Sequence, residues 1–197
     1  MATWLKKDII LDNEIKVSAQ APMIVSASRS TDIPAFYADW FLHRLKNIGY
    51  SAWTNPFNGV KNYVTYSNTH FIVFWSNNPR PLIESGLLDY LDTKGINYYI
   101  QYTLNDYEKE GLEKGVPSLD YRIETFKMLV ERLGIGKVIW RFDPLILTKD
   151  ISIDSLLSKV SKVGDSLCGF TEKMVFSFAD ILEYGKEHFI TIRFTVR

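Results

Sequence analysis

Arg141 and Asp143 are the two residues whose types and spacing suggest chemistry most clearly. They lie in residues 138–144 (VIWRFDP), a run typical of a β-strand, and strand alternation places both side chains on the same face. A guanidinium at the end of a strand would bind a phosphate or a carboxylate through two parallel hydrogen bonds, with Asp143 holding it in place. The same two residues are equally consistent with an internal ion pair that only orients the strand.

Polar side chains follow every apolar run of the chain, and this pattern predicts one shared ligand site. The loops beyond the carboxyl ends of parallel strands carry the chemistry in barrel and α/β enzymes. The predicted ligand-binding residues are Arg29, Asp32, Asn55, Asn58, Asn78, Gln101, Thr103, Arg141, Asp143 and Ser177. Arg29 would be a second positive contact, and the amides and hydroxyls would form a hydrogen-bonding wall. Capping and turn formation are the alternative explanations for Asp32, Asn55 and Asn58.

Other kinds of site have weaker support in the sequence. A divalent-metal-dependent hydrolase would use Asp32, Asp143 and Asp180 around a hard cation, but three isolated aspartates form a poor metal signature. Cys168 is the only cysteine and the three histidines are scattered, so no zinc-type spacing is present. The turn at residues 28–34 contains no glycine, which argues against a Walker loop or a dinucleotide-binding fingerprint there.

Six apolar runs predict the strands that would position these side chains, at residues 23–28, 50–54, 71–75, 98–103, 138–142 and 174–178. Their starting points lie 21 to 40 residues apart, which is far longer than hairpin spacing and favours βα units with parallel strands. Amphipathic patterns predict helices over residues 31–49, 81–94, 119–133 and 152–167. The predicted fold is α/β: a TIM-like (βα) barrel, in the form of a six-unit partial barrel, rather than an open doubly wound sheet.

Three segments depart from the repeating unit. Residues 4–19 predict an N-terminal β-hairpin, and residues 58–70 look extended rather than helical. Residues 104–117 form a polar loop that would serve either as a lid or as a packed surface loop. We predict a single domain over residues 1–197, with residues 1–22 as a hairpin extension and residues 181–197 as an atypical C-terminus.

The composition is that of a soluble globular protein. Apolar residues make up 46% of the chain, and 23 Lys plus Arg balance 23 Asp plus Glu. A net charge of zero provides no general attraction for nucleic acid or an anionic membrane. No window is apolar enough for a membrane span, and we expect a cytoplasmic location.

Several longer motifs occur in order: residues 28–37 (SRSTDIPAFY), 55–58 (NPFN), 73–79 (VFWSNNP), 100–104 (IQYTL), 122–126 (RIETF) and 138–144 (VIWRFDP). Over about residues 20–180 the chain resembles a bacterial family of unknown function, domain-of-unknown-function family 1848 (DUF1848). That family is similar to radical S-adenosylmethionine enzymes. The resemblance therefore implies a six-unit partial barrel, S-adenosylmethionine, and a C-terminal cysteine cluster that holds a four-iron, four-sulfur centre. The sequence departs from this pattern, because Cys168 alone cannot supply three thiolate ligands.

The sequence thus predicts a βα barrel with an anion- or nucleotide-binding mouth, derived from an enzyme and with its own activity left open. The expected partner is a small molecule that carries a phosphate or a carboxylate. A metal-dependent hydrolase and a non-catalytic binding or structural remnant are the alternatives. Residues 189–197 alternate like a strand, so either the gene is truncated or frameshifted, or a final strand replaces the region with the cysteines.

Overall fold

The computed structural model describes residues 5–28, 31–55 and 57–179. The chain divides into two compact units, and each is described by itself below. The N-terminal unit comprises Met1–Trp75 with Arg80–Tyr98, and the C-terminal unit comprises Ser76–Pro79 with Tyr99–Arg197. A single domain over the whole chain stays a prediction.

Two hairpins build the four-stranded sheet of the N-terminal unit. Strands β1 (Lys6–Ile10) and β2 (Lys16–Gln20) pair antiparallel, which confirms the predicted N-terminal hairpin. Strands β4 (Tyr50–Thr54) and β5 (Lys61–Thr65) form the second hairpin, and β5 also pairs in parallel with β2. The prediction that β4 is one of six parallel strands is therefore wrong. The chain turns back within residues 55–60, where the Asn55 N–H donates to the Val60 carbonyl at 2.9 Å.

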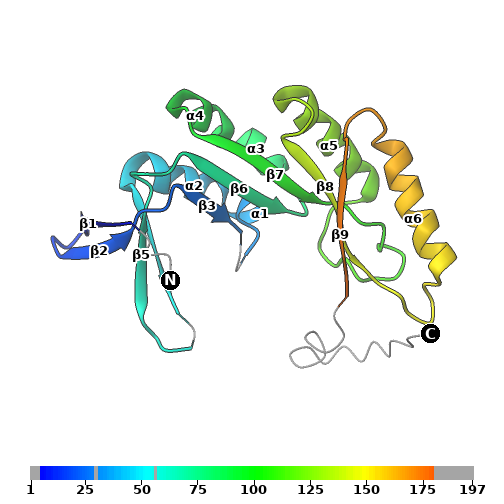
Figure 1. Ribbon diagram of the computed structural model, residues 1–197, viewed down its shortest axis with the longest axis horizontal. Helices are drawn as coiled ribbons and strands as arrows, with labels where there is room; N and C mark the ends of the chain where they lie inside the picture. Colours follow the sequence, from blue (N-terminus) through cyan, green and yellow to red (C-terminus); the bar gives the residue numbers. More distant parts are fainter. Residues whose placement is uncertain (1–4, 29–30, 56, 180–197) are drawn as a thin grey trace. The chain divides into compact units, whose positions relative to one another are not determined.

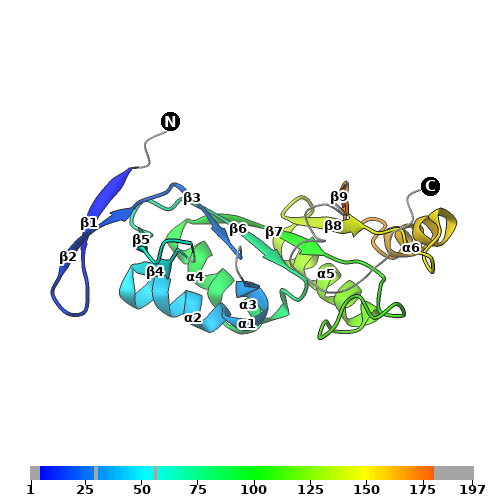
Figure 2. The same ribbon diagram turned by 90° about the horizontal axis from the view of Figure 1, so that it is seen from below.

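Strands β3 (Ile24–Ala27) and β6 (Phe71–Ser76) pair in parallel in the N-terminal unit. Figure 2 shows the helices of this unit on one side of the two strands. Phe41 packs there, with its ring centroid 6.2 Å from that of Phe74. The helices are α1 (Ile33–Phe36), α2 (Ala38–His43), the π-helical turn η1 (Arg44–Ile48), α3 (Arg80–Glu84) and α4 (Leu87–Lys94).

The predicted helices of the N-terminal unit are correct in position but interrupted. The helix expected over residues 31–49 breaks at Tyr37, where φ is −135°, and it ends at Gly49 as predicted. The helix expected over residues 81–94 breaks at Gly86, which has a φ of 74°. The side chains of Tyr37 and Trp40 are exposed, whereas that of Phe41 is buried.

The C-terminal unit contains three parallel strands, β7 (Asn97–Thr103), β8 (Val138–Leu145) and β9 (Met174–Phe178). Helix α5 (Leu119–Leu133) connects β7 to β8, and α6 (Ile153–Ser166) connects β8 to β9 (Figure 1). Tyr102 of β7 stacks on Phe126 of α5 with centroids 5.7 Å apart, and Trp140 of β8 lies against α6 at Gly164. The helices thus cover one face of this part of the sheet. Both have the predicted bounds to within one residue.

The α/β fold class is confirmed, because parallel strands alternate with helices in both units. Strands β3, β6, β7, β8 and β9 belong to a five-stranded sheet, and the pairings among the described residues leave it open. The structure therefore shows no closed barrel in this part of the chain. No helix within the described ranges is long and apolar enough to cross a membrane.

Candidate functional site

One face of strands β7, β8 and β9 is polar, although parallel strands are usually apolar on both faces. Alternation divides the side chains between the two faces, and the buried aromatic residues Tyr102, Trp140 and Phe142 lie on the face that the helices cover. The opposite face is formed by Tyr99, Gln101, Thr103, Ile139, Arg141, Asp143, Val175 and Ser177. We call these eight residues the polar face. All of them lie in the C-terminal unit.

The centre of the polar face is the ion pair between Arg141 and Asp143. Arg141 Nη2 donates to Asp143 Oδ2, and the two side chains retain 14% and 22% of their exposure. Arg141 Nη1 donates to Gln101 Oε1 at 3.3 Å, and the Ser177 hydroxyl donates to Asp143 Oδ1. Four of the predicted ligand-binding residues, from three different strands, are therefore joined in one hydrogen-bonded group. Thr103 pairs with Arg141 in the strand register, which places it beside this group.

Asn105 supports the group from the loop that follows β7. Its Oδ1 accepts from the Asp143 N–H at 2.8 Å, and its Nδ2 donates to the Asp143 carbonyl at 3.1 Å. The Asn105 side chain is buried, and the Asp143–Pro144 peptide that follows is cis. Asn105 is one of the polar residues that follow the fourth apolar run of the sequence, but it was not among the predicted ligand-binding residues. The signal that was available is a polar amide two residues beyond the end of a buried strand.

Residues 104–117 form a packed loop, which decides between the two predictions made for this segment. Residues Leu104, Asn105, Asp106 and Tyr107 are all buried. The Tyr107 hydroxyl donates to the Pro144 carbonyl at 3.0 Å and accepts from the Ile146 N–H at 3.1 Å. Burial raises the pKa of this hydroxyl to about 12, against the opposing effect of the hydrogen bond from Ile146.

Three ion pairs fasten the same loop to the helices of the C-terminal unit. Arg122 of α5 binds both carboxylate oxygens of Glu113, at 2.9 and 3.1 Å, and Glu113 also accepts from the Tyr107 N–H. Two lysines of α6 make the other pairs: Lys159 with Glu110 at 2.8 Å, and Lys162 with Asp106 at 2.9 Å. The loop is thus held to both helices and to the end of β8, the strand that carries Arg141 and Asp143.

The remaining predicted site residues have other surroundings. In the N-terminal unit, Asp32 caps α1 by accepting from the Ala35 N–H at 3.0 Å. Asn55 and Asn58 accept from the backbone N–H groups two residues ahead, at 2.9 and 3.0 Å, so both form the turn between β4 and β5. In the C-terminal unit, the Asn78 N–H donates to Ser76 Oγ at 2.9 Å. Arg29 lies outside the described residues.

The metal-dependent alternative gains no geometric support. Within the described ranges, no group of three His, Cys, Asp or Glu side chains is placed to hold a metal ion. Asp32 is a helix cap, both carboxylate oxygens of Asp143 have hydrogen-bond partners, and Asp180 lies outside the described residues. Cys168 is an exposed thiol that follows α6, and one thiol does not fit an iron–sulfur cluster.

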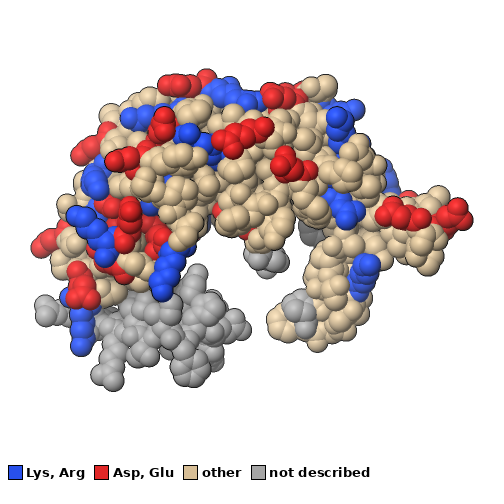
Figure 3. Space-filling model, turned by 180° about the vertical axis from the view of Figure 1, so that it is seen from behind, with Lys and Arg blue, Asp and Glu red and all other residues tan. Residues whose placement is uncertain are grey.

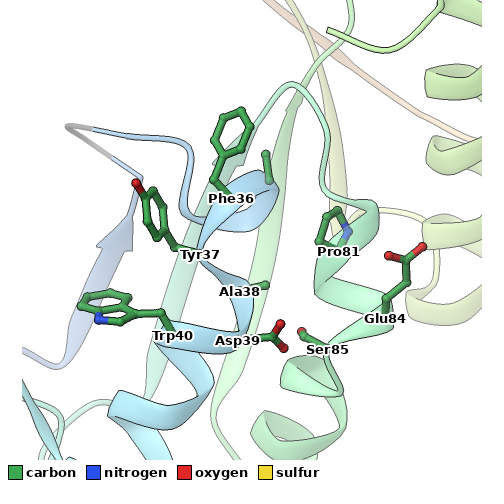
Figure 4. Close-up of a pocket in the computed structure, with 9 residues that line it drawn as sticks. Phe36, Tyr37, Ala38, Asp39, Trp40, Pro81, Glu84 and Ser85 are labelled. Carbon is green, nitrogen blue, oxygen red and sulfur yellow. The ribbon is translucent and has the colours of Figure 1, made fainter. Parts of the chain in front are cut away.

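A hollow lies in the N-terminal unit, between α1, α2 and α3 (Figure 4). Asp39 of α2 points toward Ser85 at the end of α3, whereas Tyr37 and Trp40 extend away from these two residues (Figure 4). The guanidinium of Arg44 lies 5.6 Å from the centre of the Trp40 ring. Among the described residues, none of the predicted ligand-binding residues lines this hollow.

Charge is mixed on the face of the molecule that Figure 3 shows. Lys and Arg side chains lie there among Asp and Glu side chains, in agreement with the zero net charge of the sequence.

The sequence model of a family described as Domain of unknown function (DUF1848) matches residues 24–195. The chain belongs to the DUF1848 family. The match begins at the first residue of β3 and includes all strands of the five-stranded sheet, so it contains the polar face. The β1–β2 hairpin lies outside the matched residues. Comparisons with curated proteins and with solved structures found no match.

Proposed function

We propose that this DUF1848 protein binds a small molecule at the polar face, with Arg141 contacting a phosphate or carboxylate of the ligand. The observation that carries the proposal is the Arg141–Asp143 pair in a strand of a parallel sheet, on the face opposite the covering helices. A partly buried ion pair adds little net stability compared with well-packed apolar side chains. The free-energy cost of burying the two charges is understandable if they serve to recognise a ligand.

The surroundings of Arg141 suit this role. A guanidinium is planar and recognises oxyanions bidentately, provided that its plane is fixed. Gln101 holds one amino group and Asp143 the other, and Asn105 fixes the backbone of Asp143. We therefore assign Arg141 as the anion contact and Asp143 as the residue that orients it. Gln101, Thr103 and Ser177 would supply hydrogen bonds to the rest of the ligand.

The finer predictions extend this proposal. The predicted six-unit barrel loses β4, which pairs antiparallel in the other sheet. We propose that the five parallel strands and their helices represent a partial (βα) barrel, supported by the polar residues at the carboxyl ends of β7, β8 and β9. A nucleotide or S-adenosylmethionine is a ligand class that the site would take without an iron–sulfur cluster. A radical-enzyme ancestry, a bacterial origin and a cytoplasmic location remain proposals from the sequence. A metal-dependent hydrolase and a non-catalytic remnant are the competing functions.

A thermal-shift screen of the full chain tests the proposal, because a ligand that binds only the folded state raises its melting temperature. The probes are ATP, S-adenosylmethionine, ribose 5-phosphate, citrate and inorganic phosphate, with magnesium chloride as a separate arm. The matched variants are Arg141→Gln and, as a control, Arg132→Gln at the exposed end of α5.

We expect at least one probe that carries a phosphate or a carboxylate to raise the melting temperature of the wild type and of Arg132→Gln but not of Arg141→Gln. An anion-dependent shift that survives in folded Arg141→Gln overturns the assignment of Arg141. A shift with magnesium alone favours the hydrolase, and no shift with any probe favours the remnant.

A further inference from the structure

The charges of the polar face balance within one residue pair, and this balance restricts the class of ligand. Arg141 brings one positive charge and Asp143 one negative charge, and the two groups are in direct contact. No other charged side chain lies on this face among the described residues. A ligand that carries only a negative charge would be attracted by Arg141 and repelled by the adjacent Asp143. The described part of the site thus offers a dipole rather than a positive pocket.

The hydrogen-bonding groups around Asp143 are rich in acceptors. An ionised carboxylate accepts about four hydrogen bonds, and Arg141 and Ser177 account for one each. The Ser177 hydroxyl donates to Asp143, so its oxygen is oriented to accept. Gln101 directs its amide oxygen toward Arg141 and therefore toward the same group. An ammonium, which has three donors and no acceptor, matches this set.

Building on the function proposed above, we infer that the ligand is a zwitterion, with a carboxylate for Arg141 and an ammonium for Asp143. Two opposite charges on the ligand would lie antiparallel to the Arg141–Asp143 dipole, so that each charge meets its opposite. Neighbouring carboxylate and ammonium groups occur together in free amino acids. They also occur in larger molecules that keep the unmodified α-ammonium and α-carboxylate groups of an amino acid. Such a ligand needs no separation of Arg141 from Asp143.

Three forms of one probe separate the two charges. Each member of a panel of free L-amino acids is compared with its N-acetyl derivative, which keeps only the carboxylate, and with its amide, which keeps only the ammonium. Binding is measured by thermal shift and calorimetry on the full chain. We expect the best free amino acid to bind at least tenfold more tightly than either derivative, a difference of about 1.4 kcal/mol or more.

Variants of Arg141 and Asp143 are expected to change the binding of the two derivatives in different ways. Asp143→Asn is expected to weaken the binding of the free amino acid by tenfold or more. The same change should strengthen the binding of the N-acetyl derivative, because a charge that repels its carboxylate is removed. Arg141→Gln is expected to weaken the binding of the free amino acid and to strengthen the binding of the amide. Asp165→Asn, at an exposed position on α6, is the control that should change neither. Circular dichroism establishes that each variant is folded, and the three-form comparison on the wild type decides the question if Asp143→Asn does not fold.

The outcomes distinguish this inference from the proposed function. Equal or tighter binding of the N-acetyl derivative by the wild type, lost in Arg141→Gln, overturns the zwitterion and leaves the anion site in place. Amide binding that equals that of the free amino acid overturns both the zwitterion and the role of Arg141. Binding of neither the amino-acid panel nor any anionic probe overturns both proposals.

Discussion

Asn105 binds both backbone polar groups of Asp143: its Oδ1 accepts from the Asp143 N–H and its Nδ2 donates to the Asp143 carbonyl. The side-chain amide thus acts like one more residue of a neighbouring strand, at the point where β7 has already ended. The carboxylate of Asp143 can therefore hold Arg141 only while the loop that carries Asn105 stays in place. We therefore expect stability and the proposed ligand binding to be coupled at this contact.

Replacing Asn105 with Ala leaves the N–H and the carbonyl of Asp143 without their partner. We expect a loss on the order of 2 to 4 kcal/mol in the free energy of unfolding, because each unsatisfied buried group costs about 1 to 3 kcal/mol. Urea unfolding measures the change. Asn97→Ala, at the exposed start of β7, is the control and should stay within about 0.5 kcal/mol. A loss in Asn105→Ala as small as that of the control would mean that water replaces the amide without cost.

The Glu113–Arg122 pair gives a second prediction, because the side chains are only 9% and 1% exposed. Arg122→Met leaves the Glu113 carboxylate buried without its partner, and we expect a loss of about 3 to 5 kcal/mol. The double variant Glu113→Leu with Arg122→Met should recover most of this loss. About 1 kcal/mol should remain, because the Tyr107 N–H loses its acceptor Glu113. Additive losses in a double-mutant cycle would show that the pair is not energetically coupled.

The sequence predicted those elements whose patterns are local. Helices α5 and α6 have clear apolar periodicity, and a glycine follows shortly after the C-terminus of each helix. Their bounds were therefore predicted closely. Strand β4 was predicted to its exact residues but as a parallel strand, whereas it pairs antiparallel with β5. Partner choice depended on the turn at residues 55–60, where two asparagines hydrogen-bond the backbone and bring the chain back as a hairpin.

The candidate site shows the same distinction. Alternation along a strand was sufficient to predict that Arg141 and Asp143 share a face, and their ion pair agrees with this. Gln101 and Ser177 join them because parallel strands align their carboxyl ends. The role of Asn105 could not be predicted, since it depends on the path of the loop over the end of β8. That path is held by Lys159 and Lys162, whose partners Glu110 and Asp106 are remote in sequence. Arg122 adds a more local contact with Glu113.

Asp32 provides a test that separates capping from metal binding. Asp32→Ala removes the acceptor for the Ala35 N–H, and we expect a loss of about 1 kcal/mol in the free energy of unfolding. Asp32→Asn keeps a side-chain oxygen and should remain within about 0.5 kcal/mol of the wild type. Magnesium should change the melting temperature of neither variant. A magnesium-dependent stabilisation of the wild type that Asp32→Asn abolishes would instead support the hydrolase.

We predict that the protein loses stability at high pH because of the Tyr107 hydroxyl. Burial raises the pKa of its hydroxyl to about 12, whereas the hydroxyl of an unfolded chain has a pKa of about 10. Below pH 10 both states hold the proton, so the group adds no pH dependence. Between about pH 10 and 12 the unfolded state releases the proton and the folded state keeps it, so stability falls as the pH rises. The total loss is on the order of 3 kcal/mol, because each unit of pKa difference corresponds to about 1.36 kcal/mol.

Tyr107→Phe isolates this effect from the lysines that titrate in the same range. At neutral pH the variant should be less stable by about 1 to 3 kcal/mol, because the Ile146 N–H loses its acceptor and the Pro144 carbonyl loses its donor. The difference in the free energy of unfolding between wild type and variant should then shrink from pH 10 to pH 12. Only the wild type has a tyrosine at this position that loses stability as the pH rises. Urea unfolding at pH 8, 10 and 11.5 measures that difference. A difference that stays constant over this range would show that the Tyr107 hydroxyl ionises as easily in the folded chain as in the unfolded one.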